Sequence, residues 1–147
     1  DFLRALDLGQ TLTIRSPNAV RPWQHVLEPL SGYIMLAEKL YEDGDEFAEA
    51  WNFGPDNSDN KSVQWVIEHL FNTIQKGNWQ LDEQLQLREA NILKLDSTKA
   101  KTVLGWKPKW DLETSLNKTI EWHNKYRQGN KMDKITLQQI QTYENSI

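Results

Sequence analysis

The chain has 147 residues, of which 38% are hydrophobic and 26% charged, with a formal net charge of −4. This composition is typical of a globular protein large enough to build a hydrophobic core. The negative charge excludes the strong basic face that nucleic-acid binding needs. The absence of Cys excludes disulfides, thiolate nucleophiles and Cys-ligated metals. No apolar run approaches the roughly 20 residues of a membrane helix and no signal-peptide pattern opens the chain, so we predict a cytoplasmic protein.

The chain begins with Asp1, inside a helix-like run that reaches Leu8, and this start predicts a fragment of a longer or processed chain. Gly9 is placed to end that first helix. Residues 11–16 then alternate polar and apolar, the period of a half-buried strand.

Residues 20–41 predict a strand, a turn and a helix with Arg21 at the strand end. Pro22 biases Arg21 toward extended backbone, and Pro29 has no N–H to lose in the first turn of a following helix. Apolar residues then recur at three- and four-residue spacing, which predicts one buried helix face. That face contains Leu30, Tyr33, Ile34, Ala37, Leu40 and Tyr41.

The remaining pattern alternates short strands with helices. Strands are expected at 50–55, 79–87 and 91–95, and helices at 62–76, 98–104 and from Asp111 onward. Beyond Gly129 a polar tail, 129–147, follows and is possibly helical if it packs against something. Few, short strands separated by helices predict a mostly helical α/β part whose main sheet lies elsewhere. The seven Trp residues are expected mainly in the core, with a cleft wall or interface as the other use.

Several catalytic patterns are missing. No two glycines lie closer than ten positions, so the chain has no glycine-rich loop for a dinucleotide phosphate. None of the four tyrosines has a Lys four residues later, and the three histidines lack metal-site spacing. We therefore predict no catalytic, cofactor-binding or metal-binding residue in this chain.

What remains is suited to binding an anionic sugar compound. Arg21 and Arg88 lie next to predicted strand ends, and a guanidinium grips phosphate through paired hydrogen bonds. Glu89 is placed to accept hydrogen bonds from two sugar hydroxyls. The alternative for each is a surface charge or an ordinary ion pair. His25 is expected to be a packed strand histidine, and Glu28 is expected to support the following helix through its dipole.

The order of the motifs is similar to a known family. The sequence reads Ile14-Arg15-x-Pro17-x-Ala19-x-Arg21-Pro22-Trp23-Gln24-His25-Val26, then Gly32-Tyr33-x-x-Leu36-Ala37-Glu38 and Trp51-Asn52-Phe53-Gly54-Pro55. Further on it reads Arg88-Glu89-Ala90, Leu95-Asp96-Ser97-x-Lys99-Ala100 and Leu104-Gly105-Trp106-x-Pro108. These motifs resemble the C-terminal half of extended short-chain dehydrogenases/reductases that act on nucleotide sugars, and within them the CDP-glucose 4,6-dehydratases.

The resemblance implies an enzyme of deoxysugar biosynthesis that converts CDP-glucose to CDP-4-keto-6-deoxyglucose. It implies NAD bound by an N-terminal Rossmann half, which would also carry the catalytic Tyr and Lys. It places Arg21 and Arg88 on the substrate pyrophosphate and Glu89 on the nucleotide ribose. Residues 1–128 would form the nucleotide-sugar-binding domain, and the fragment alone would be inactive.

Two alternatives stay open at this point. One is an epimerase or another nucleotide-sugar dehydratase with the same architecture, and the base could be that of CDP, UDP, dTDP or GDP. The other is a binding or interaction module without catalysis. Surface that the missing half would cover predicts a homo-oligomer, because a large apolar patch seldom stays in water. No nucleic acid and no membrane are expected as partners.

Overall fold

The structure, a computed structural model, describes residues 1–82 and 90–146. Contacts divide the chain into two compact units that alternate along the sequence. Unit 1 contains residues 1–21 and 60–94, and unit 2 contains residues 22–59 and 95–147. The chain therefore passes from one unit to the other three times, and each unit is described separately below.

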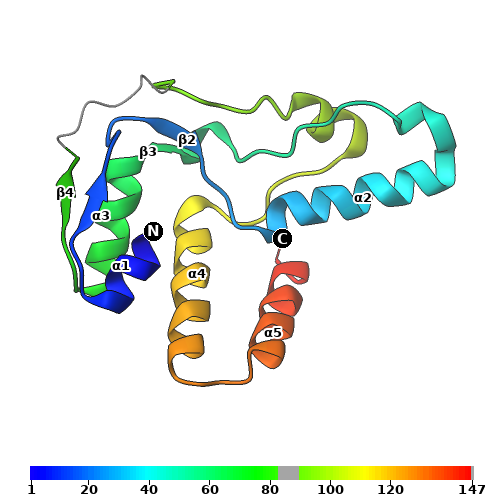
Figure 1. The fold of residues 1–147 in the computed structure, drawn as a ribbon. Helices are drawn as coiled ribbons and strands as arrows, with labels where there is room; N and C mark the ends of the chain where they lie inside the picture. The colour runs from blue at the N-terminus through cyan, green and yellow to red at the C-terminus, as the bar shows by residue number, and fades with distance from the viewer. Residues whose placement is uncertain (83–89, 147) are drawn as a thin grey trace. The chain divides into compact units, whose positions relative to one another are not determined.

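Unit 1 contains two helices and short strands (Figure 1). Strand β1 (Leu12–Ile14) pairs in parallel with β4 (Trp79–Leu81), with Leu12 opposite Trp79. Strand β2 (Val20–Pro22), which ends at the unit boundary, pairs with β3 (Asn60–Ser62). Helices α1 (Phe2–Leu8) and α3 (Val63–Ile74) complete the unit. Its core contains Leu12, Ile14 and Ile67, against which Phe2, Ala5, Val63, Phe71 and Trp79 pack.

Local signals determine where these elements begin and end. Gly9 ends α1 with a φ of 64°, a left-handed conformation that glycine adopts without steric cost. The Ser62 hydroxyl accepts a 3.1 Å hydrogen bond from the Trp65 N–H and so caps α3. The structure therefore confirms the helices predicted at residues 1–8 and 62–76 and the strand predicted at residues 11–16.

Unit 2 is mostly helical (Figure 1). Its elements are α2 (Leu27–Asp43), the 3₁₀ turns η1 (Gly44–Phe47) and η2 (Asn57–Asp59), the π-helical η3 (Ala100–Leu104), α4 (Leu112–Arg127) and α5 (Met132–Glu144). Asp111 caps α4 by accepting a 2.8 Å hydrogen bond from the Thr114 N–H. Hydrogen bonds from Thr114 lower the pKa of the Asp111 carboxyl. Helix α5 occupies the segment predicted as a polar tail.

The core of unit 2 contains Phe53, Ala100, Leu104 and Trp106. The Phe53 ring meets the Trp106 ring edge to face, with centroids 5.1 Å apart. Phe53 also lies directly on α2 at Gly32, where a Cβ atom would be 2.2 Å from its Cδ1. Glycine at position 32 therefore lets the segment around Phe53 approach the helix.

The following expectations from the sequence were wrong. Helix α2 begins at Leu27, before Pro29, and its predicted buried face is exposed: Tyr33 is 56% exposed and Ile34 63%. Residues 50–55 form no strand, because no strand of the described residues lies beside them to supply hydrogen bonds. Residues 91–95 form only a single bridge, from Ile92 to Val20. The mostly helical class with few short strands is confirmed.

Within the described residues, no helix is long and apolar enough to cross a membrane. In the same part of the chain, no group of three or more His, Asp or Glu residues is arranged to hold a metal ion.

Candidate functional site

Arg21 lies in the middle of β2, with its side chain half-buried. Its Nη1 donates hydrogen bonds of 2.9 Å to the carbonyl oxygens of Val20 and Ala90. Two backbone hydrogen bonds join β2 to residues 91–93. The Val20 N–H donates to the Asn91 carbonyl at 2.8 Å, and the Leu93 N–H donates to the Val20 carbonyl at 3.0 Å. These contacts fix the guanidinium on the three-residue strand β2, one residue before the strand end at which the sequence predicted it.

The other two predicted binding residues, Arg88 and Glu89, lie outside the described residues. Ala90, the last residue of their motif, is described, and its carbonyl accepts the hydrogen bond from Arg21. The structure thus brings Arg21 to the residue next to Glu89. The roles of Arg21, Arg88 and Glu89 stay predictions.

Residues 23–28, which follow Arg21 in the motif, belong to unit 2 and are held by polar contacts. The Gln24 Nε2 donates a 2.8 Å hydrogen bond to the Phe53 carbonyl. The His25 Nδ1 accepts a 3.3 Å hydrogen bond from the Leu27 N–H, so the imidazole proton is on Nε2. The buried His25 ring meets Trp110 edge to face, with centroids 5.0 Å apart. His25 is therefore a packed histidine, as the sequence predicted, but it lies outside a strand because β2 ends at Pro22.

Burial lowers the pKa of the His25 imidazole below its ordinary value of 6.5. The unfolded chain therefore binds this proton at a higher pH than the folded chain does. We expect the free energy of unfolding to fall as the pH drops below about 6.5, because protonation favours the unfolded state. His25→Gln should make stability less dependent on pH in this range, measured by urea denaturation from pH 7.5 to 5. Parallel pH curves for the parent and the variant would contradict this expectation.

Glu28 is fully buried in the first turn of α2, with an exposed fraction of 0%. Its Oε1 accepts a 2.8 Å hydrogen bond from the Trp110 N–H, and its Oε2 accepts one of 3.0 Å from the Lys109 N–H. The Tyr143 hydroxyl donates a further 2.7 Å hydrogen bond to Oε2. One buried carboxylate therefore joins α2, the connector before α4 and the C-terminal helix α5. The sequence predicted Glu28 at the helix start, but it gave no sign of this network.

Further contacts surround the carboxylate. The Ser31 hydroxyl donates a 2.7 Å hydrogen bond to the Glu28 carbonyl and lies 3.0 Å from the Tyr143 hydroxyl. It also accepts a 2.9 Å hydrogen bond from the Trp106 Nε1. Burial raises the pKa of the Tyr143 hydroxyl far above its usual value, so this group acts only as a neutral donor. The network has the geometry of a structural support.

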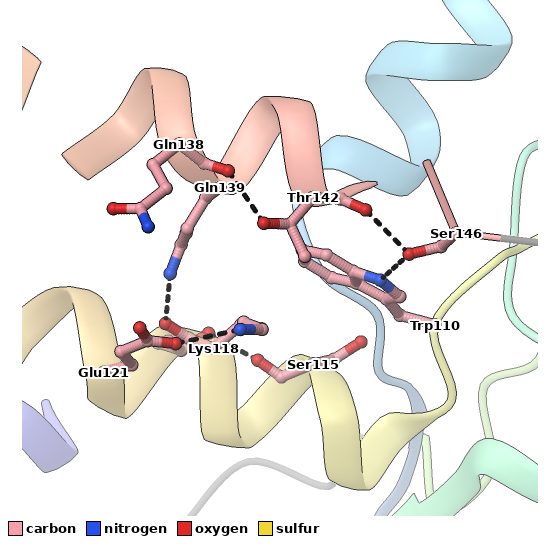
Figure 2. A network of polar contacts seen from close by, with 9 residues as sticks. Trp110, Ser115, Lys118, Glu121, Gln138, Gln139, Thr142 and Ser146 are labelled. Carbon is pink, nitrogen blue, oxygen red and sulfur yellow. Dashed lines mark hydrogen bonds and ion pairs between the residues drawn. The ribbon is translucent and has the colours of Figure 1, made fainter. Parts of the chain in front are cut away.

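Helix α5 packs along α4 through a set of polar contacts (Figure 2). The Gln139 Nε2 donates a 2.8 Å hydrogen bond to the Lys118 carbonyl. The Trp110 Nε1 donates a 2.9 Å hydrogen bond to the Ser146 hydroxyl, which itself donates to the Thr142 carbonyl. At the same end, the Lys109 ammonium donates to the carbonyls of Tyr143 and Glu144. The negative end of the helix dipole also stabilises a cation at this position.

The residues of this chain do not fit a dinucleotide cofactor. The glycines are too widely spaced to let backbone approach a pyrophosphate at a helix start. The helices α3 and α4 instead begin after Ser62 and Asp111, whose side-chain oxygens each accept a hydrogen bond from one N–H group of the first turn. A cofactor would therefore have to be held elsewhere.

Comparison with solved structures defines the fold class. One similar structure is a dTDP-glucose 4,6-dehydratase from Bacillus anthracis in complex with NAD. The similarity covers 84% of this chain and 37% of that enzyme, with a TM-score of 0.67 and 21% identity. A UDP-glucose 4-epimerase from Stenotrophomonas maltophila, with bound NAD and formylated UDP-arabinopyranose, is similar over 87% of this chain and 39% of its own, with a TM-score of 0.70 and 16% identity. The fold is that of the C-terminal part of an extended Rossmann-type dehydratase or epimerase.

Sequence comparison gives a more particular match. The chain is 41% identical to the CDP-glucose 4,6-dehydratase of Salmonella typhimurium over 144 residues, 97% of this chain and 40% of that enzyme. A UDP-glucose 4-epimerase from Halalkalibacterium halodurans is 26% identical over 86% of this chain and 37% of its own length. No family model matches the sequence. The resemblance predicted from the motifs is confirmed, and the chain spans about two fifths of the length of these relatives.

Proposed function

We propose that this chain is the nucleotide-sugar-binding part of a CDP-glucose 4,6-dehydratase. The observation that carries the proposal is the 41% identity to the Salmonella typhimurium enzyme across nearly the whole chain. The identity to the UDP-glucose 4-epimerase of Halalkalibacterium halodurans is 26%, which favours the dehydratase over the epimerase.

In this proposal, residues 1–128 bind the substrate, and Arg21, Arg88 and Glu89 are its contacts. Arg21 and Arg88 hold the pyrophosphate, and Glu89 accepts hydrogen bonds from the ribose hydroxyls. The position of Arg21 on the short strand β2, anchored through Nη1 to two carbonyls, supports its part in the proposal.

The chemistry belongs to the whole enzyme. CDP-glucose is oxidised at C4, loses water across C5 and C6 and regains the hydride at C6, so NAD is regenerated. NAD is held by a cofactor-binding part that the match leaves out, and this chain alone does not turn over. The parent acts in the cytoplasm and forms a homo-oligomer.

The test is calorimetric titration of the purified chain with CDP, and with UDP, dTDP and GDP for comparison. CDP should bind most tightly. Arg21→Ala should weaken CDP binding at least about tenfold, because a charge-assisted hydrogen bond contributes about 1.5 to 3 kcal/mol. Arg15→Ala removes an exposed arginine just after β1 and should leave binding unchanged.

Thermal melting of both variants checks that the fold is intact. Equal binding of all four nucleotides, or equal loss in the two arginine variants, would contradict the assignment. If the unmodified chain binds none of them, the titration is repeated on a chain extended upstream, and failure there also rejects the proposal.

A further inference from the structure

Residues 22–28, called the link segment, lead from the end of β2 into the first turn of α2. The residue just before them is Arg21, the proposed phosphate contact. Strand β2 has only three residues and belongs to a two-stranded sheet, which is marginally stable by itself. The backbone of Arg21 therefore depends on how firmly the chain beyond β2 is held.

The link segment is anchored at both of its ends within unit 2. Near its start, the Gln24 Nε2 donates a 2.8 Å hydrogen bond to the Phe53 carbonyl. At its other end, the buried Glu28 carboxylate accepts hydrogen bonds from two backbone N–H groups of the connector before α4. The Glu28 N–H also donates a 3.0 Å hydrogen bond to the His25 carbonyl, which closes the turn between these two residues.

Helix α5 reaches the link segment through Tyr143, by two routes. Its hydroxyl donates a 2.7 Å hydrogen bond to Oε2 of Glu28. Its ring meets the Trp110 ring edge to face with centroids 5.0 Å apart, and Trp110 meets His25 edge to face at the same distance. All four of these side chains are buried, so water does not compete for their contacts.

We infer that Tyr143 is a positioning residue for nucleotide-sugar binding, acting through Glu28 and the link segment on Arg21. The inference rests on the proposed function. A binding group whose backbone is already ordered loses less conformational entropy when its ligand arrives, so the ligand binds more tightly. Helix α5 thus contributes to binding without being among the proposed contacts.

A second polar contact of α5 separates positioning from simple attachment of the helix. Gln139 is buried on α5, and its Nε2 donates a 2.8 Å hydrogen bond to the Lys118 carbonyl on α4 (Figure 2). This contact attaches α5 to α4 but does not lead to the link segment. Loss of either hydrogen bond should weaken the attachment of α5 to a similar extent. Only the loss of the Tyr143 contact should affect Arg21.

The test compares Tyr143→Phe with the matched control Gln139→Met in the complete 147-residue chain. Each variant keeps a side chain of similar size and removes one donor. Thermal melting should show similar losses of stability. Calorimetric titration well below both melting temperatures should show CDP binding weakened at least about threefold in Tyr143→Phe, because the link segment must then be ordered on binding. Gln139→Met should bind CDP like the parent chain.

Amide hydrogen exchange without ligand provides a second readout. In Tyr143→Phe, exchange at residues 20–28 should be faster than in the parent, whereas Gln139→Met should leave these amides unchanged. The N–H groups of Val20 and Glu28 report on the two sides of the segment, because both donate backbone hydrogen bonds.

Equal CDP affinities of the two variants, or equal exchange at residues 20–28, would overturn the positioning role and leave the proposed function intact. If neither the parent chain nor the chain extended upstream binds CDP, the proposed function fails. The positioning role then fails with it, even where exchange shows that Tyr143 holds the link segment.

Discussion

Glu28→Ala is expected to lower the free energy of unfolding by about 2–4 kcal/mol, because it removes the shared acceptor of three donors, one of them the buried Trp110 N–H. These donors are the N–H groups of Lys109 and Trp110 and the hydroxyl of Tyr143. Each unsatisfied buried group costs about 1–3 kcal/mol, and water entering the space left by the carboxylate reduces the sum. Urea denaturation followed by far-UV circular dichroism measures the effect.

Two further variants define the cause. Tyr143→Phe removes one donor and leaves the carboxylate with two, so it should cost only about 1 kcal/mol. Glu42→Ala removes a carboxylate that is 61% exposed and paired with Lys39 at the surface, where such a pair contributes at most about 1 kcal/mol. If Glu28→Ala were no more destabilising than Glu42→Ala, the buried network would not hold the unit together.

Trp106→Ala should lower the free energy of unfolding by about 3–5 kcal/mol, because it opens a cavity in the core of unit 2. The Trp106 side chain is 1% exposed, packs against Phe53, and donates a 2.9 Å hydrogen bond to Ser31. Trp106→Phe keeps an aromatic ring but loses the donor, so it should cost less than the alanine variant. The readout is again urea denaturation by far-UV circular dichroism, which does not depend on tryptophan fluorescence.

Trp122→Ala is the matched control for this prediction. Trp122 is half-buried on α4, stacks on Tyr126 and donates a hydrogen bond to Thr136 near the surface. Its loss should cost less than about 1.5 kcal/mol. Similar losses for Trp106→Ala and Trp122→Ala would show that the core of unit 2 does not depend on Trp106.

The elements that the sequence predicted correctly depend on short-range chemistry. Gly9, Ser62 and Asp111 end or cap a helix through groups no more than five residues away, so the sequence shows both partners. The extended backbone of Arg21 in β2 also follows from its neighbour Pro22.

The errors concern contacts between distant parts of the chain. Periodicity showed that α2 has an apolar side, but it did not show whether anything in this chain covers that side. Residues 50–55 have a strand-like sequence, yet a strand requires a neighbour. The Glu28 network was missed because two of its donors are backbone N–H groups more than 80 residues away, which any residue except proline carries.

The alternation of the two units affects how the chain can fold during synthesis. Strand β1 is made before its partner β4, which follows only after 64 further residues, from position 15 to position 78. A ribosome-bound chain that ends before Trp79 therefore cannot complete unit 1, and one that ends before Tyr143 cannot satisfy Glu28. Each unit is made of two separate segments of the sequence, so each closes only after its second segment is made, and no single proteolytic cut releases either of them as a continuous piece.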